Sequence, residues 1–141
     1  MIVTNNQHAL ITWLCDRTKL APTRNIRCIG RLNAEGNLIG VVGFDNFTGA
    51  SAAIHIAGEG NWLSRRLLWV VFDYAFVQNK LKVLFAQVNT NNRKSLKLNL
   101  HIGFKQECVL KDVFTDGDAV ITSLRAEDCK YLERKEHGQV N

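Results

Sequence analysis

The stretch from residue 51 to residue 88 most constrains the fold, because two β runs there flank one long apolar helix. The first run, Ala52 to Ala57, alternates with the period of two expected of a half-buried strand. After a glycine turn, Trp62 to Val77 is apolar on nearly every side, as expected of a helix packed deep against a sheet. Lys82 to Val88 is a continuous apolar run, which indicates a buried strand. This order predicts a right-handed crossover and a parallel strand pair.

The segments before this unit predict a helix and two more strands. Asn5 and Asn6 can cap an amphipathic helix, which Pro22 prevents from continuing. Two β runs with a short turn follow, Ile26 to Leu32 and Leu38 to Phe44. Together with the run at Ala52 they predict an antiparallel meander of three strands.

The segments after this unit predict a helix, a hairpin and a short charged helix. Leucines at helical spacing follow Asn92, and Gly103 suits the position where a left-handed residue ends a helix. The runs 106–114 and 119–125 predict a hairpin across the turn at residues 115–118. A last, charged helix is expected from Glu127 to Lys135.

Composition indicates one globular domain over residues 1–141, since 46% of residues are hydrophobic, 22% are charged, and no linker or repeat is present. Residues 1–10 lack a basic leader with an apolar run, so we expect no secretory signal. The apolar stretch Leu67 to Val77 is interrupted by Asp73 and is too short to span a membrane. The four cysteines form no C-x-x-C pair, which predicts free thiols in the cytoplasm and no metal site.

The net charge of +5 is concentrated in one window of the sequence. Asn61 to Lys105 holds eight Lys or Arg residues against the single acid Asp73, which gives this window +7 and leaves −2 for the rest. A local basic field predicts an anionic partner, either a nucleic acid or a small phosphorylated ligand.

The segment VNTNNRKSLKLNLHIGF, residues 88–104, and the order of elements around it resemble the Gcn5-related N-acetyltransferase (GNAT) superfamily, in particular compact members from bacteriophage genomes. The superfamily has a motif similar to N-x-x-A/S-x-x-L-Y-x-K-x-G-F. The residues that match it in register are Asn92, Ser95, Leu98, Gly103 and Phe104. The hairpin segment VLKDVFTDGDAVITSL is similar to the superfamily's closing hairpin, so the resemblance covers roughly Ile26 to Arg125.

The resemblance implies an α+β fold with a mixed sheet, in which an antiparallel meander adjoins a central pair of parallel, splayed strands flanked by helices. It also implies that acetyl-CoA, the acyl donor, lies between the splayed strands, with its pyrophosphate at the N-terminus of the next helix, where free N–H groups bind anions. The cofactor-binding residues expected on this basis are Ile56, Ala57, Gly58, Gly60, Asn61, Trp62, Arg65, Arg66, Asn92 and Ser95. An ordinary strand-to-helix turn and simple helix capping by the asparagines stay open as alternatives.

Two residues near the implied reaction centre are candidates for a catalytic base, His55 and Glu59. An imidazole has an ordinary pKa suited to proton transfer near neutrality, whereas a packed strand histidine and a solvated loop acid are the structural alternatives. Asn99 occupies the position where the superfamily often has a tyrosine that protonates the departing thiolate. An amide cannot act as a general acid.

The leading hypothesis is an acyl-CoA-dependent N-acyltransferase that moves an acetyl group from acetyl-CoA to a primary amine in a ternary complex. The alternative, motivated by Trp62 and Asn99, is a catalytically degenerate GNAT-like fold that acts as a binding or virion-associated protein. Nucleic-acid binding is a third class, but no recognition motif supports it. The amine acceptor is not encoded in any motif, no membrane partner is expected, and a homodimer is left open.

Overall fold

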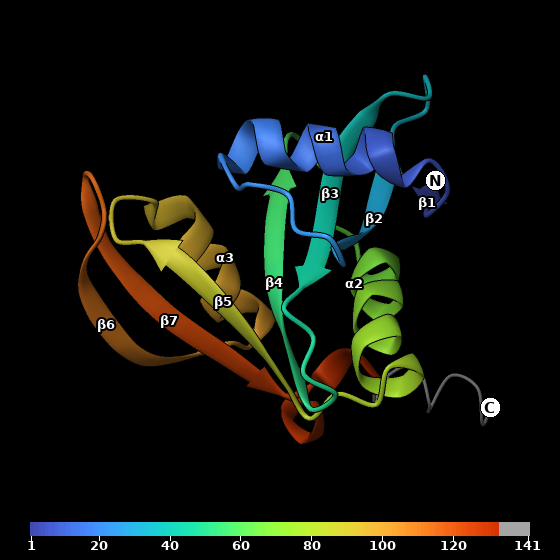
Figure 1. Ribbon diagram of the computed structural model, residues 1–141. Coiled ribbons are helices and arrows are strands. Elements are labelled where there is room, and N and C mark those ends of the chain that lie inside the picture. The colour runs from blue at the N-terminus through green and yellow to red at the C-terminus, as the bar shows by residue number, and fades with distance from the viewer. Residues whose placement is uncertain (133–141) are drawn as a thin grey trace.

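The computed structural model describes residues 1–132 (Figure 1), which form a mixed sheet of seven strands in the order β1-β2-β3-β4-β5-β7-β6. The strands are β1 (Ile2–Val3), β2 (Arg27–Leu32), β3 (Leu38–Asp45), β4 (Ser51–Gly58), β5 (Val83–Asn89), β6 (Lys105–Phe114) and β7 (Gly117–Arg125). The helices are α1 (Gln7–Thr18), α2 (Arg65–Phe72), the π-helical segment η1 (Asp73–Gln78), α3 (Arg93–Ile102) and the 3₁₀ turn η2 (Ala126–Asp128). The meander, the central parallel pair and the flanking helices are as predicted.

Helix α1 begins and ends where the sequence predicts. The Asn6 side chain accepts a hydrogen bond from the Ala9 N–H at 3.4 Å, and Lys19, in the left-handed region, ends the helix by donating to the Cys15 carbonyl. Leu10 and Leu14 bury the inner side of the helix on the sheet. A Cβ added at Gly43 would lie 2.5 Å from Leu14, so the glycine permits this close approach.

Helix α2 begins later than the sequence predicts. It starts at Arg65 rather than Trp62, because the Ser64 hydroxyl accepts a hydrogen bond from the Leu67 N–H at 3.1 Å and caps the first turn. Trp62 instead packs against the sheet in the larger core, with 7% of its surface exposed. Its indole packs directly against Gly58, where an added Cβ would lie 2.2 Å from the ring.

The central strands β4 and β5 are parallel and pair over only three positions, from Ser51 with Val83 to Ala53 with Phe85. β5 then leaves β4 and pairs antiparallel with β7 along its whole length. Helix α3 follows β5; it is capped by Asn92 and ends at Gly103, whose φ of 121° favours glycine. The predicted end of this helix is therefore confirmed.

The sheet has two faces, which the strand register defines. One face, called the α1 face, includes Val41 and Gly43 of β3 and lies under α1. The other face carries the larger core, which includes Phe44, Ile54 and Leu84 and packs against α2 and α3. Alternation along each strand assigns every side chain to one of the two faces.

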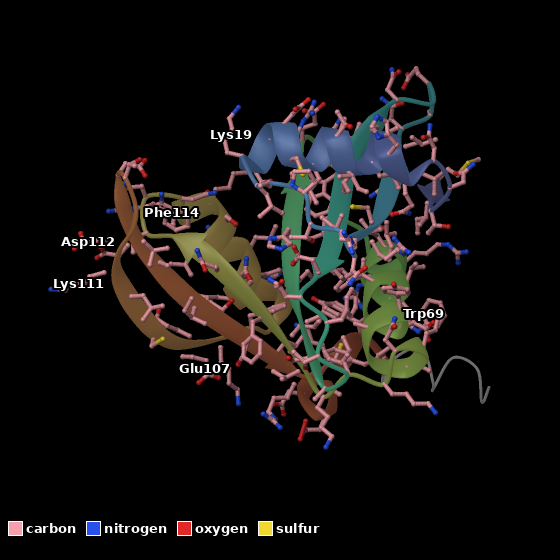
Figure 2. The ribbon with its side chains drawn as sticks, in the orientation of Figure 1. Lys19, Trp69, Glu107, Lys111, Asp112 and Phe114 are labelled. Carbon is pink, nitrogen blue, oxygen red and sulfur yellow. The ribbon has the colours of Figure 1, made fainter. Side chains whose placement is uncertain are left out.

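The hairpin of β6 and β7 lies at one edge of the sheet. Its turn is at Thr115 and Asp116, so β7 begins two residues before the predicted start at Ala119. Glu107, Lys111 and Asp112 lie along the outer side of β6 in Figure 2. Of the predicted last helix, η2 and the helical residues 130–132 are described, and residues 133–135 lie outside the described part of the chain.

None of the helices among residues 1–132 is both long and apolar enough to cross a membrane.

Candidate active site

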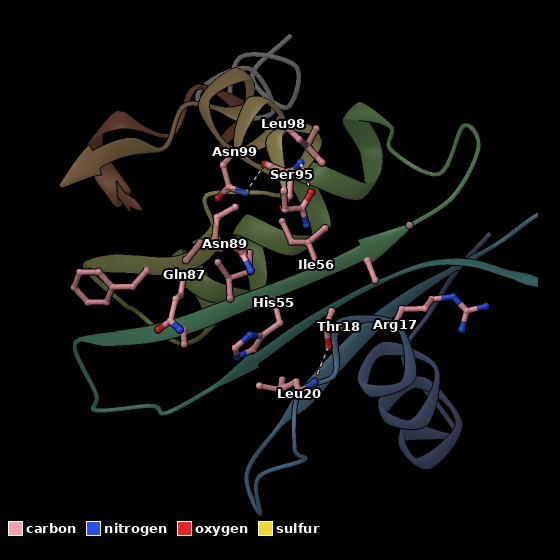
Figure 3. A pocket seen from close by; sticks show the side chains of 18 of the residues that line it. Arg17, Thr18, Leu20, His55, Ile56, Gln87, Asn89, Ser95, Leu98 and Asn99 are labelled. Carbon is pink, nitrogen blue, oxygen red and sulfur yellow. Dashed lines mark hydrogen bonds between the residues drawn. The ribbon is translucent and has the colours of Figure 1, made fainter. Parts of the chain in front are cut away.

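A cavity of about 790 Å³ opens where β4 and β5 separate. Its lining comes from the end of α1, the ends of β3, β4 and β5, the start of α3, and the hairpin strands. In Figure 3, His55 points from β4 toward the end of α1, whereas Ile56 points to the opposite side, toward Ser95 and Leu98 of α3. The cavity therefore reaches both faces of the sheet through the gap between the strands.

On the side of β4 that faces the gap, the backbone N–H and C=O groups make no hydrogen bonds to β3. The Glu59 N–H donates to the Ile39 carbonyl at 2.8 Å, and bonded positions alternate along an antiparallel pair. The backbone groups of His55 and Ala57 are therefore hydrogen-bonded to β3. The N–H and C=O groups of Ile56 and Gly58 point the other way, toward β5. Because the pairing with β5 ends at Ala53, these groups are available to an extended ligand.

His55 is held by a buried carboxylate. Its Nε2 lies 2.7 Å from Oδ1 of Asp45, and Oδ2 of Asp45 accepts a hydrogen bond from the Thr23 hydroxyl at 3.0 Å. The side chain of Asp45 is 2% exposed, and that of His55 is 22% exposed. A carboxylate only accepts, so Nε2 carries the proton in the neutral ring and Nδ1 keeps a lone pair. This arrangement suits His55 to take a proton from a molecule in the cavity.

Glu59, the second candidate base, also lines the cavity but is more solvated. Its side chain is 60% exposed, and Oε2 lies 3.9 Å from Nε of Arg17. The Arg17 guanidinium in turn stacks 3.6 Å above the ring of Trp13. Between the two candidates, His55 has the better-fixed geometry.

The start of α3 forms the wall of the cavity opposite His55. Asn92 Oδ1 accepts from the Ser95 N–H at 3.1 Å, which leaves the amide N–H groups of Asn92 able to donate to a ligand. Asn99 is 3% exposed; it donates to the Ser95 carbonyl at 3.0 Å and accepts from the Thr122 hydroxyl at 3.2 Å. The amide oxygen of Asn99 therefore ties α3 to β7, whereas its N–H bond to Ser95 lies within the helix.

The structure places only some of the predicted cofactor-binding residues in the cavity lining. Those that line the cavity are Ile56, Ala57, Gly58, Trp62, Asn92 and Ser95. Those outside its lining are Gly60, Asn61, Arg65 and Arg66. Both arginines are exposed in the first turn of α2.

Two cysteines, Cys15 and Cys28, lie near the carboxylate of Asp45. Burial, with Cys15 and Asp45 nearby, raises the pKa of the Cys28 thiol to about 12. Burial also raises the pKa of Cys15, with Asp16 and Asp45 adding to the effect. Both thiols are therefore neutral and poorly nucleophilic near pH 7. No three metal-ligating side chains among the described residues are grouped in a way that would hold a metal ion.

Solved structures of one bacterial enzyme share this architecture. A variant of spermidine N-acetyltransferase SpeG from Vibrio cholerae superposes with a TM-score of 0.76 at 20% identity, over 96% of this chain and 99% of that chain. The chain has the GNAT fold. The dodecameric form of SpeG gives 0.74 at 20% identity over 95% and 96% of the two chains, and its manganese complex gives 0.72 at 21% identity over 95% of each.

No protein-family profile and no curated protein matches the sequence itself. At 20% identity the structural likeness shows the fold alone, so the relation to bacteriophage members stays a prediction.

Sequence reasoning missed several residues of the site. Asp45 is the most important, and its signal was a lone acid that ends the otherwise apolar run of β3. Thr23 lies in the loop after α1, where its contact with Asp45 has no local signal. The apolar run of β5 predicts a buried strand, but Phe85 and Gln87 are exposed and line the cavity.

Proposed function

We propose that the protein is an acyl-CoA-dependent N-acyltransferase that transfers an acetyl group from acetyl-CoA to a primary amine in a ternary complex. The carrying observation is the gap between β4 and β5, which has free backbone groups on one side and the Asp45-held His55 beside it. A cavity open on both faces admits the acyl donor from one face and the amine from the other. The fold, shared with SpeG, supports the same chemistry.

The α3 side of the gap suits the acyl donor. The backbone groups of Ile56 and Gly58 can pair with the amides of a pantetheine arm as a neighbouring strand would. Asn92 and Ser95 lie along the same path and offer side-chain hydrogen bonds.

The phosphates of the donor fit the charges at the helix starts. Arg65 and Arg66 occupy the first turn of α2, and Arg93 and Lys94 occupy that of α3, with no acid in either turn. Cations at the positive end of a helix dipole are unfavourable unless an anion binds nearby. The proposal therefore keeps the predicted role of Arg65 and Arg66 in binding phosphate.

The reaction we propose needs a group that accepts the proton of the attacking amine. The amine nitrogen attacks the thioester carbonyl, forming the C–N bond, and His55 Nδ1 accepts the proton that the nitrogen loses. Collapse of the tetrahedral intermediate breaks the C–S bond and releases the CoA thiolate, which takes up a proton to give CoA. Asp45 stabilises the imidazolium through the 2.7 Å bond to Nε2.

Asn99 has no acid role in this scheme, because its amide is committed to Ser95 and Thr122. A thiol of moderate pKa leaves without strong acid assistance, so the reaction proceeds without the tyrosine.

Calorimetric titration with acetyl-CoA, followed by a thiol-release assay with primary amines, tests the proposal. We expect binding below millimolar ligand and a loss of about 10²–10⁴-fold in kcat for His55→Ala. His8→Ala, a change at an exposed histidine of α1, is the matched control and should leave kcat unchanged. Absence of acetyl-CoA binding at near-millimolar ligand would reject the proposal. Binding without turnover would favour the degenerate GNAT-like alternative.

A further inference from the structure

The strand register places one group of cavity residues on the α1 face beside His55. Ala53 pairs with Phe85 and Gln87 pairs with Ile121. Directly paired residues share a face, and Ala53 and His55 alternate to the same face of β4. Phe85, Gln87 and Ile121 therefore lie on the face toward which His55 points, and the donor contacts proposed above lie on the other. We call the part of the cavity on this face the acceptor side.

The acceptor side has an apolar surface. Phe85 is 40% exposed although it lies on a central strand, and Ile121, which pairs with Gln87 and lies diagonally across from Phe85, is partly exposed. Leu20, from the loop after α1, and Phe114, at the end of β6 (Figure 2), also line the cavity. An exposed aromatic ring inside a cavity is a typical surface for binding the apolar part of a ligand.

Among the described residues, the cavity offers few carboxylates to bind additional ammonium groups. Its acids are Asp45 and Glu59. Both oxygens of Asp45 are engaged, by His55 and by Thr23, and the side chain is 2% exposed. Glu59 faces Arg17 at 3.9 Å. Lys94, also in the lining, adds a positive charge, which disfavours a polycation at this site.

We propose that the acceptor is a monoamine whose single amino group carries an apolar aryl or alkyl group, and that Phe85, Ile121 and Leu20 bind this group while His55 receives the amine proton. The inference rests on the proposed function, which makes an amine the acceptor of the acetyl group. It assigns a substrate class, apolar monoamines, and it excludes polyamines, although SpeG is named for spermidine. Gln87 supplies one neutral hydrogen-bonding group at the same surface.

The deciding experiment compares two amines by binding, which needs no turnover. Calorimetry in the presence of CoA should give 2-phenylethylamine a Kd at least about tenfold lower than that of spermidine. Phe85→Ala should raise the Kd of 2-phenylethylamine about tenfold and leave that of acetyl-CoA unchanged. Leu110→Ala is the matched control, since Leu110 is 49% exposed on the same face but outside the cavity lining.

Each outcome addresses one proposal separately. Equal or tighter binding of spermidine, or an unchanged Kd for 2-phenylethylamine in folded Phe85→Ala, would overturn the inference. Preferential binding of 2-phenylethylamine without any transfer from acetyl-CoA would uphold the inference about the site and reject the acyltransferase activity. Phe85→Glu gives a second check, because a new carboxylate at this position should bring the two Kd values closer together.

Discussion

The two halves of the sheet differ in how their α1 face is covered. Around β2, β3 and β4, α1 packs so closely that Leu14 is fully buried and an added Cβ at Gly43 would lie 2.5 Å from it. Around β5, β7 and β6, the same face leaves Phe85 at 40% and Leu110 at 49% exposure. The well-packed half, β2 to β4, thus holds His55 and Asp45 in place. The other half, β5 to β7, has an open face that provides the surface for a ligand.

The largest expected difference between the halves concerns stability. Leu14→Ala should lower the free energy of unfolding by about 2–5 kcal/mol, because it leaves a cavity under α1. Leu110→Ala should change the free energy of unfolding by less than about 0.5 kcal/mol, because the side chain is already half solvated. Urea unfolding of both variants measures the contrast. Similar losses in the two variants would contradict the division into a packed and an open half.

The next largest effect concerns the carboxylate that the packed half holds under His55. Asp45→Asn keeps the shape of the side chain but removes the charge that fixes the tautomer of His55, so kcat should fall about a hundredfold. KM for the amine should change little, and the pH dependence of kcat should shift, which a purely structural loss would not produce. Asp16→Asn, at an exposed acid of α1, is the control. An unchanged kcat and pH profile in Asp45→Asn would remove Asp45 from the mechanism.

A smaller effect is expected at the joint between α3 and β7. Asn99→Ala removes the acceptor of the Thr122 hydroxyl and the donor to the Ser95 carbonyl, so the free energy of unfolding should fall by about 1–2 kcal/mol. The kcat value should stay within about threefold of the parent, because Asn99 donates no proton in the reaction. Thermal unfolding and the thiol-release assay measure the two quantities. A loss of kcat as large as that of His55→Ala would show a direct catalytic role.

Thiol chemistry distinguishes the halves without any mutation. Cys108, exposed on β6, should be alkylated quickly by iodoacetamide in the native protein, whereas Cys28, buried under α1, should react only after unfolding. Mass spectrometry of partially labelled protein locates the modified residues. Rapid native labelling of Cys28 would show that α1 opens readily from the sheet.

The last prediction concerns the pH dependence that Cys28 adds to the free energy of unfolding. Its folded pKa of about 12 is raised above the ordinary 9.0, so its contribution is fully present below pH 9 and is lost as the pH rises from 9 toward 12. Chemical unfolding between pH 7 and pH 10.5 should show this decline, and Cys28→Ala should reduce its slope. An identical slope in the variant would assign the decline to other groups.

The elements of the fold were predictable where local signals decide them. Asn6 caps α1, Gly103 ends α3, and the parallel pair follows from a strand, an apolar helix and a strand. The start of α2 was predicted three residues too early, at Trp62. Trp62 has the apolar character of the helix that follows, and only the packing of its indole over Gly58 removes it from that helix.

The sequence by itself determined the order of the elements, the antiparallel meander and the crossover, because side-chain period, caps and turn residues act over a few positions. The resemblance to the GNAT superfamily also suggested His55 and Glu59 as residues near the gap. Only the tertiary structure decided that Asp45, ten residues away in the chain, holds Nε2 of His55. Only the structure placed Leu20, Phe85 and Ile121 around one apolar surface, since strand pairing and helix docking join residues that local patterns cannot relate.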